Sequence, residues 1–167
     1  HALQHRGQES AGIVTTYFDE KKDRHTMPMH KGFGLVLSVY DDPKIFKNEL
    51  KGRSAIGHNR YSTSGSSKNP ANIQPFRVHY RNGNLAIGHN GNLSNARTLR
   101  ERFRDEGVLF QSTSDTELIL HLISHSREKD QMDQIMDALS QIEGAYCLVI
   151  LTDDKLIAVR DPNGFRP

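Results

Sequence analysis

The sequence predicts an α+β domain that is built on antiparallel sheets, with helices packed outside them. Apolar and β-branched segments come as hairpins around short polar loops, and not as the βαβ crossovers that a parallel sheet requires. The expected helices cluster between the hairpins, within residues 93–142. The segment Ala145–Leu151 is apolar on both faces, which is typical of a strand inside a layered structure. These three observations together favour the α+β class.

In the first half of the chain, turn residues separate β-branched runs, which predicts mainly strands. The expected elements are strands at Ala11–Phe18, His25–His30 and Ser54–Tyr61, a turn at Lys31–Gly34, and a helix from Asp41 to Leu50 with a proline near its first turn. The segment Ser62–Gln74 is rich in Ser, Gly, Asn and Pro, so we expect a loop there.

The second half contains three segments with apolar residues at helical spacing. The expected elements are the hairpin Phe76–Tyr80 with Leu85–His89, helices at Leu93–Glu106, Ser114–Ser126 and Gln131–Ile142, and strands at Ala145–Thr152 and Lys155–Arg160. In the middle helix, Leu118 and Leu122 belong to a stripe that should be buried. No linker divides the 167 residues, so we expect one domain.

The composition excludes several classes of function. Lys and Arg number 22 against 20 Asp and Glu, and this balance does not favour binding to nucleic acid or to a membrane. No apolar run approaches the length that spans a bilayer. The single cysteine cannot form an intramolecular disulfide and fits a reducing compartment, so we expect a cytoplasmic protein.

The pentapeptide A-I-G-H-N occurs twice, at Ala55–Asn59 and at Ala86–Asn90. The second copy continues into Gly91 and Asn92, and we interpret His89–Asn92 as a polar turn between a strand and a helix, with Asn92 as the N-cap. Such a turn aims backbone N–H groups outward at a small anionic atom. Asn90 and the Gly91 N–H could therefore form an oxyanion hole.

The first copy continues into Arg60, whose planar guanidinium suits a carboxylate. Arg60 ends a strand and begins a loop of small residues, as a ligand lid would. Asp115 begins a helix, where it could be a cap residue or could pair with an ammonium group. An Arg and an Asp that bind carboxylate and ammonium together would bind a free α-amino acid.

Three other features have an ordinary structural interpretation. Cys147 lies inside an apolar strand, where a buried and inert thiol is expected. His121 and His125 are four residues apart on a helix but lack a third ligand, so we expect no metal site. The helix with four arginines also carries acidic residues, which is typical of a solvated face rather than of a nucleic-acid surface.

Six motifs in this order resemble the amidophosphoribosyltransferase family over the whole chain. They are Leu3-Gln4-His5-Arg6-Gly7-Gln8-Glu9-Ser10-Ala11-Gly12-Ile13, Gly57-His58-x-Arg60-Tyr61-Ser62-Thr63, Gln74-Pro75-Phe76, His89-Asn90-Gly91-Asn92-Leu93, Ser112-Thr113-Ser114-Asp115-Thr116-Glu117 and Arg160-Asp161-Pro162-x-Gly164-x-Arg166-Pro167. One departure is Asn59, where the family is expected to have Val or Thr.

The resemblance implies an N-terminal-nucleophile hydrolase fold, a four-layer αββα sandwich with antiparallel sheets, here without its first strand. It implies that residues 1–167 form a type 2 glutamine amidotransferase, or glutaminase, domain. Glutamine would bind with its α-carboxylate at Arg60 and its α-ammonium at Asp115, under a loop that includes Tyr61, Ser62 and Thr63. Asn90 and the Gly91 N–H would stabilise the oxyanion, and Arg6 and His89 would organise the site structurally.

The resemblance also implies parts that this sequence does not contain. The family's nucleophile is a Cys at the mature N-terminus, whose α-amine serves as base, and Cys147 cannot replace it. We expect the chain to be truncated at both ends, without its phosphoribosyltransferase domain, and to be inactive alone. The intact enzyme would transfer ammonia from glutamine to phosphoribosyl pyrophosphate and form phosphoribosylamine in purine synthesis. It would bind Mg²⁺ in the transferase domain, could carry an iron–sulfur cluster, and would form a homo-oligomer.

Two alternatives stay open at this point. Glucosamine-phosphate and asparagine synthetases share the H-N-G and S-D-T-E elements, although their other motifs differ from Arg60-Tyr61-Ser62-Thr63. A glutamine-binding module without catalytic activity would also contain the carboxylate and ammonium sites.

Overall fold

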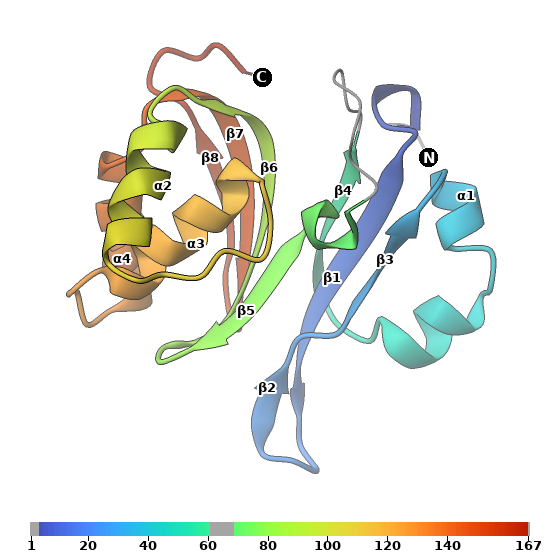
Figure 1. Cartoon of the computed structure of the whole chain (residues 1–167). Coiled ribbons are helices and arrows are strands. Elements are labelled where there is room, and N and C mark those ends of the chain that lie inside the picture. The colour runs from blue at the N-terminus through green and yellow to red at the C-terminus, as the bar shows by residue number, and fades with distance from the viewer. Residues whose placement is uncertain (1–3, 61–68, 167) are drawn as a thin grey trace.

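Two four-stranded antiparallel sheets lie face to face in the computed structural model, which describes residues 4–60 and 69–166 (Figure 1). The first sheet is made from the N-terminal part of the chain and the second from the C-terminal part. Helices lie on the outer sides of the pair. The predicted α+β class with antiparallel sheets is therefore confirmed.

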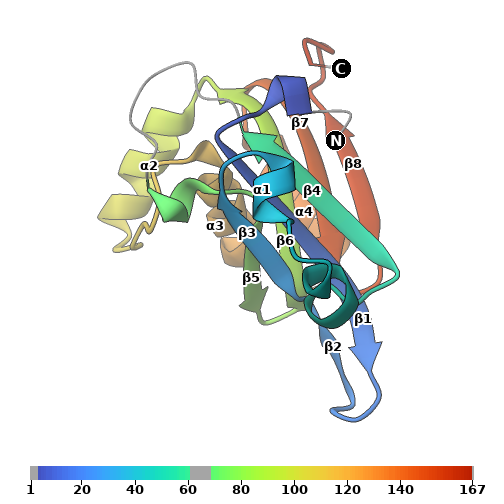
Figure 2. The same ribbon diagram turned by 90° about the vertical axis from the view of Figure 1, so that its right-hand side faces the viewer.

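The first sheet is centred on β1 (Ser10–Asp19), which pairs with three strands. Its partners are β2 (Arg24–Thr26), β3 (Met29–Phe33) and β4 (Ser54–Arg60), all antiparallel to it. The β1–β4 register opposes Ser10 to Arg60 at one end of the sheet. Figure 2 shows this sheet in front of the second one.

The second sheet has the simple order β5-β6-β7-β8. Its strands are β5 (Phe76–Tyr80), β6 (Gly83–Leu93), β7 (Gly144–Thr152) and β8 (Leu156–Arg160). β5 pairs with β6 only from Phe76 opposite Ile87 to the hairpin turn, whereas β7 pairs with β6 as far as Leu93. One edge of β6 therefore loses its neighbouring strand after Ile87.

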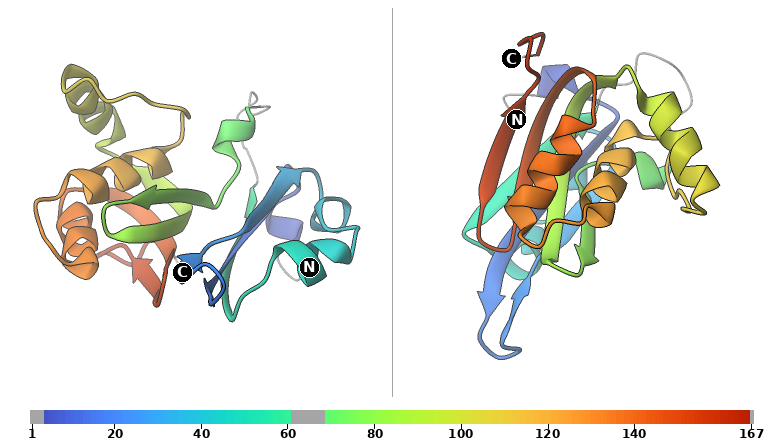
Figure 3. Two further views of the ribbon diagram at one scale, coloured as in Figure 1. Left: turned by 90° about the horizontal axis from the view of Figure 1, so that it is seen from below. Right: turned by 90° about the vertical axis from the view of Figure 1, so that its left-hand side faces the viewer.

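Three helices cover the outer side of the second sheet, and the shorter helical segments lie beyond the first, except for η3, which lies between the two sheets (Figures 1 and 3). The three are α2 (Ala96–Asp105), α3 (Asp115–His125) and α4 (Gln131–Ser140). The shorter segments are η1 (Gln4–Arg6), α1 (Val36–Val39), the π-helical η2 (Ile45–Glu49) and η3 (Pro70–Asn72). Among the described residues, none of the helices could cross a membrane.

Two apolar clusters hold the layers together. The larger one lies between the second sheet and its helices and includes Ile87, Leu118 and Leu148, all fully buried. The smaller one joins the two sheets, with Ile56 from the first and Ala86 from the second. Burial of apolar surface on both faces explains why β7 lacks the polar alternation of a half-exposed strand.

The structure differs from the sequence predictions in the first half of the chain. The predicted strand His25–His30 is divided at Met27-Pro28 into β2 and β3, and β3 continues through the predicted turn to Phe33. Proline has no N–H to donate to a ladder, which accounts for the break. The predicted helix Asp41–Leu50 is reduced to the five residues of η2, and α1 was not predicted.

The prediction of a polar turn after His89 is wrong. β6 continues through that segment to Leu93 because β7 pairs with it along the whole length. Asn92 consequently does not cap a helix. α2 begins at Ala96 after Asn95, whose carboxamide donates to the Gln141 carbonyl and accepts from the Glu143 N–H.

Candidate functional site

One edge of β6 presents three alternate backbone N–H groups where β5 has ended. The His89 N–H donates to Gln74 Oε1 at 2.7 Å, and the Leu93 N–H donates to Asp115 Oδ2 at 3.2 Å. N–H groups of alternate residues leave a strand on the same edge, so the Gly91 N–H faces this edge too. The register places no β5 residue opposite Gly91. Within residues 4–60 and 69–166, no strand pairs with this edge at Gly91, so its N–H can donate to a ligand.

Gly91 is at a position where only glycine fits. Its φ is +152°, and a Cβ there would lie 2.2 Å from the Ala145 carbonyl oxygen and 2.6 Å from the Tyr146 Cα. Both of these atoms belong to the backbone of β7, which cannot move aside as a flexible side chain could. The close approach of β7 therefore requires the absence of a side chain at this donor.

Asn90 and Arg60 project into the space between the sheets from opposite sides. Side chains alternate along a strand, and Ala86 of β6 packs in the inter-sheet cluster, so the exposed Asn90 lies on the same face. On β4, Ile56 packs in this cluster and His58 reaches His89, which places Arg60 on the face toward the second sheet. Both residues lie beyond the cluster, toward one end of the sandwich.

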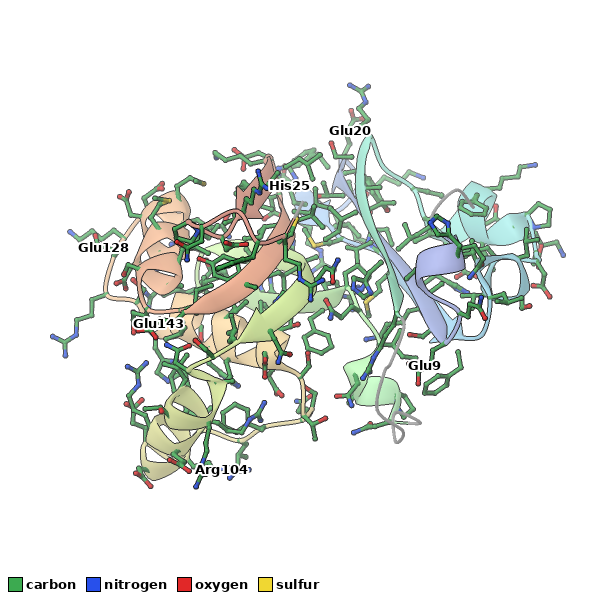
Figure 4. The ribbon with its side chains drawn as sticks, turned by 90° about the horizontal axis from the view of Figure 1, so that it is seen from above. Glu9, Glu20, His25, Arg104, Glu128 and Glu143 are labelled. Atoms are coloured by element: carbon green, nitrogen blue, oxygen red, sulfur yellow. The ribbon has the colours of Figure 1, made fainter. Side chains whose placement is uncertain are left out.

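Arg60 is anchored at two points and is still partly exposed. Its Nε lies 3.8 Å from Glu9 Oε2, and its Nη1 donates to the Asn72 carbonyl at 3.3 Å. Glu9, labelled in Figure 4, lies just before β1. The guanidinium carries five N–H donors and 26% of the side chain is exposed, which leaves room for a carboxylate to bind.

Asn72 connects Arg60 to the beginning of α3. Its carboxamide donates to Thr113 Oγ1 at 3.0 Å and accepts from the Thr113 N–H at 3.1 Å. The same residue accepts the Arg60 bond with its carbonyl. The sequence prediction missed Asn72, because its partners are 12 and 41 residues away and leave no local pattern.

Asp115 is the first residue of α3, and Ser114 is the N-cap, accepting from the Thr116 N–H at 3.3 Å. The carboxylate of Asp115 is therefore not the cap, and it points to β6, where it accepts from Leu93. A carboxylate has two oxygens that each accept more than one hydrogen bond, so it can also bind an ammonium group. Arg100 supports this corner by donating to the Ser112 and Ser114 carbonyls.

His89 is buried and His58 is partly buried, and both imidazoles are neutral near pH 7. Burial lowers the pKa of each imidazole to about 4, and each has a cationic residue nearby, Arg166 for His89 and Arg60 for His58, which acts in the same direction. His89 Nδ1 lies 3.3 Å from Thr116 Oγ1 in α3, on the helix side of the sheet. His58 Nε2 lies 3.1 Å from the His89 carbonyl oxygen and donates to it. The predicted role of His89 in organising the site stays a prediction.

Other predicted residues lie outside the part that can be described. Tyr61, Ser62 and Thr63 fall within residues 61–68, and the side chain of Arg6 is also outside the described atoms, although its backbone belongs to η1. Their assignments stay predictions.

The cysteine and the histidine pair that the sequence singled out lie in ordinary structural positions. Cys147 lies inside β7 opposite Asn90 and is only partly buried, not fully as predicted. His121 packs against the rings of Phe103 and Phe110, and His125 Nδ1 bonds to the His121 carbonyl. Within the described residues, no group of three or more His, Cys, Asp and Glu side chains could bind a metal ion.

Two arginines of α2 lie beside acidic residues of the same helix. Arg97 pairs with Glu101 at 2.9 Å and Arg102 lies 3.9 Å from Glu106, both one helical turn apart. Such pairs are typical of a solvated helix face. The arrangement therefore gives no support to a nucleic-acid surface.

Known proteins resemble this chain in sequence and in structure. Residues 58–167 match the family of glutamine amidotransferase domains. The chain is 48% identical over 167 residues to amidophosphoribosyltransferase 1, chloroplastic, of Arabidopsis thaliana, covering all of this chain and 28% of that protein. It is 43% identical to the amidophosphoribosyltransferase of Lacticaseibacillus casei, covering all of this chain and 82% of that one.

A solved structure described as glutamine phosphoribosylpyrophosphate amidotransferase from B. subtilis, complexed with ADP and GMP, is 42% identical and superimposes with a TM-score of 0.87. It covers all of this chain, which spans 34% of that structure's chain. This match agrees with the expected sandwich of two antiparallel sheets between helices. The chain belongs to the family of glutamine amidotransferase domains and, with its relatives, to the amidophosphoribosyltransferases.

Proposed function

We propose that this domain binds glutamine between β4, β6 and α3 and releases its amide as ammonia. The α-carboxylate binds Arg60 and the α-ammonium binds Asp115, which places the side-chain carbonyl toward Asn90 and the Gly91 N–H. The observation that carries the proposal is the edge of β6, where the Gly91 N–H lies between two N–H groups that Gln74 and Asp115 already engage.

The proposed chemistry is acyl transfer to a cysteine thiolate that lies outside these 167 residues. The thiolate attacks the amide carbon of glutamine, and the electron pair of the C=O bond moves to oxygen. Asn90 and Gly91 donate to this oxyanion, a contribution of about 3 kcal/mol for each donor. The α-amine of the cysteine, which took the thiol proton to form the thiolate, returns this proton as an α-ammonium to the leaving nitrogen when the C–N bond breaks. Ammonia leaves, and water then hydrolyses the thioester to glutamate.

We further propose that the ammonia is transferred within a longer enzyme to phosphoribosyl pyrophosphate, giving phosphoribosylamine. The chain spans 28% of its Arabidopsis relative, so the features of the longer enzyme are part of the proposal. These features are a phosphoribosyltransferase domain that binds Mg²⁺, an iron–sulfur cluster and a homo-oligomeric assembly. We also propose a cytoplasmic location, whereas the relatives from Arabidopsis thaliana and Vigna aconitifolia are named chloroplastic.

Calorimetry with glutamine tests the binding site directly. Arg60→Ala should abolish binding, because it removes the charge-assisted bonds to the carboxylate. Arg81→Ala is the matched control, since Arg81 also donates to a backbone carbonyl but lies at the hairpin turn between β5 and β6. Unchanged affinity of the Arg60 variant would refute the carboxylate assignment. Binding without hydrolysis by the full-length protein would favour a module that only binds glutamine.

A further inference from the structure

Gln74 bonds to β6 with its side chain as a neighbouring strand would with its backbone. Its Oε1 accepts from the His89 N–H at 2.7 Å, and its Nε2 donates to the His89 carbonyl at 3.2 Å. Two residues that face each other in a hydrogen-bonded antiparallel pair exchange the same two bonds. The carboxamide, which is buried, therefore supplies one more step of the ladder.

The register explains why a side chain has this role. Phe76 opposes Ile87, so a continued strand would oppose Gln74 to His89. The strand does not continue in this way, because the backbone of Gln74 is directed to the first sheet. The Gln74 carbonyl oxygen lies against β1, only 2.2 Å from where a Cβ on Gly12 would be. The main chain of Gln74 thus contacts the first sheet, and its side chain pairs with the second.

A second side chain bonds to the same peptide group. His58, from β4 of the first sheet, donates to the His89 carbonyl at 3.1 Å. This carbonyl belongs to the planar peptide unit that ends at the Asn90 nitrogen and Cα. Gln74 and His58 together therefore determine the orientation of the backbone immediately before Asn90 and Gly91.

We propose that Gln74 is a positioning residue for the oxyanion hole: its carboxamide fixes the His89 peptide so that the Asn90 side chain and the Gly91 N–H meet the oxyanion. This inference rests on the proposed hydrolysis of glutamine. Arg60 and Asp115 bind the ground state of the substrate, whereas the oxyanion donors act in the transition state. Loss of the Gln74 bonds should therefore reduce kcat and leave KM for glutamine almost unchanged.

The test compares variants of the full-length enzyme in steady-state kinetics. Gln74→Met keeps the side-chain length and removes both bonds. We expect kcat for glutamine hydrolysis to fall on the order of 10²-fold, as for a small misplacement of catalytic groups. KM for glutamine should change less than about threefold, since ground-state contacts persist. Synthesis of phosphoribosylamine from free ammonia should be unaffected, because it does not use this site.

Gln134→Met is the matched control for a general loss of stability. Gln134 is a fully buried carboxamide that also uses both its groups, accepting from the Tyr80 hydroxyl and donating to the Glu128 carbonyl, but it lies in α4. It should lower the melting temperature and leave kcat unchanged. If Gln74→Met does not fold, Gln74→Asn retains the amide on a shorter stem and should show the same selective loss of kcat.

The outcomes separate this inference from the proposed function. If the Gln74 and Gln134 variants lose kcat equally, or if the Gln74 variants raise KM alone, Gln74 does not position the oxyanion hole. If Arg60→Ala in the same series leaves KM for glutamine unchanged, the proposed glutamine site itself is wrong.

Discussion

The two copies of A-I-G-H-N have the same five residues and opposite orientations. In Ala55–Asn59, Ile56 and His58 face the second sheet. In Ala86–Asn90, the matching Ile87 and His89 face the helices, packing with the larger cluster and with Thr116. Successive side chains of a strand point to opposite faces of its sheet. A shift of one residue in the position of the pentapeptide therefore exchanges the residues that face the other sheet with those that face away from it. The comparison teaches that the same five residues direct different side chains into the space between the sheets. The first copy directs the imidazole of His58 there, and the second copy directs the carboxamide of Asn90.

The largest expected difference between the copies concerns their asparagines. Asn90→Ala in the full-length enzyme should reduce kcat for glutamine hydrolysis by about 10²–10³-fold, because it removes an oxyanion donor. Asn59→Ala should leave kcat within about twofold of the parent, since Asn59 lies on the opposite face of β4 from His58 and Arg60. Steady-state kinetics on both variants decides the matter. Similar losses of kcat for both would contradict the assignment of Asn90.

The second prediction concerns acid stability, which the histidines of both copies should influence in the same direction. The pKa of His58 is lowered by burial to about 4 from an ordinary value of 6.5, so the unfolded chain binds more protons between these pH values. Stability should therefore fall as the pH falls from 6.5 to 4, by at most about 3 kcal/mol for this group. His58→Gln should remove that part of the acid sensitivity, as measured by urea unfolding at pH 7 and at pH 4.5.

His89 should also reduce the stability of the fold as the pH falls, since burial lowers its pKa to about 4 as well. The control is His79→Gln, because His79 is exposed on β5. An acid sensitivity that is identical in the parent chain and in His58→Gln would show that His58 does not titrate in this way.

The smallest difference concerns the glycines of the two copies. A Cβ on Gly88 would lie 3.1 Å from Val149 Cγ2, whereas a Cβ on Gly57 would have no atom closer than 3.6 Å. Gly88→Ala should therefore destabilise the chain by about 1 kcal/mol through overpacking. Gly57→Ala should be neutral or stabilise by up to about 1 kcal/mol, because alanine restricts the unfolded chain. Urea unfolding measures the free energy of unfolding of both variants. A larger loss of stability in Gly57→Ala than in Gly88→Ala would contradict the expected packing.

Local patterns predicted most of the fold. The apolar spacing of Leu118 and Leu122 correctly indicated a buried helix, and the turn after Tyr80 correctly indicated the hairpin of β5 and β6. The strand character of His89–Asn92 was not predictable, because these polar residues are typical of a turn. Pairing with β7 over the full length of β6 overrides that local preference.

The candidate site was predictable only in part. Motifs predicted roles for Arg60, Asn90 and Asp115. The structure adds contacts of Asn72 and Gln74, which join segments 12 to 41 residues apart. No short-range pattern encodes such side-chain bonds to a distant backbone. The hydrogen bond from the Leu93 N–H to the Asp115 carboxylate was not predictable for the same reason.

The contact between Gly12 and Gln74 has a mechanical consequence. With no side chain at Gly12, the backbone of β1 lies directly against the backbone of the Gln74 segment. Side chains deform by changing rotamer, whereas two apposed backbones do not, and packed protein interiors are nearly incompressible. The Gln74 segment is therefore a rigid main-chain spacer between the two sheets, and we expect main-chain atoms to determine the width of the proposed glutamine site.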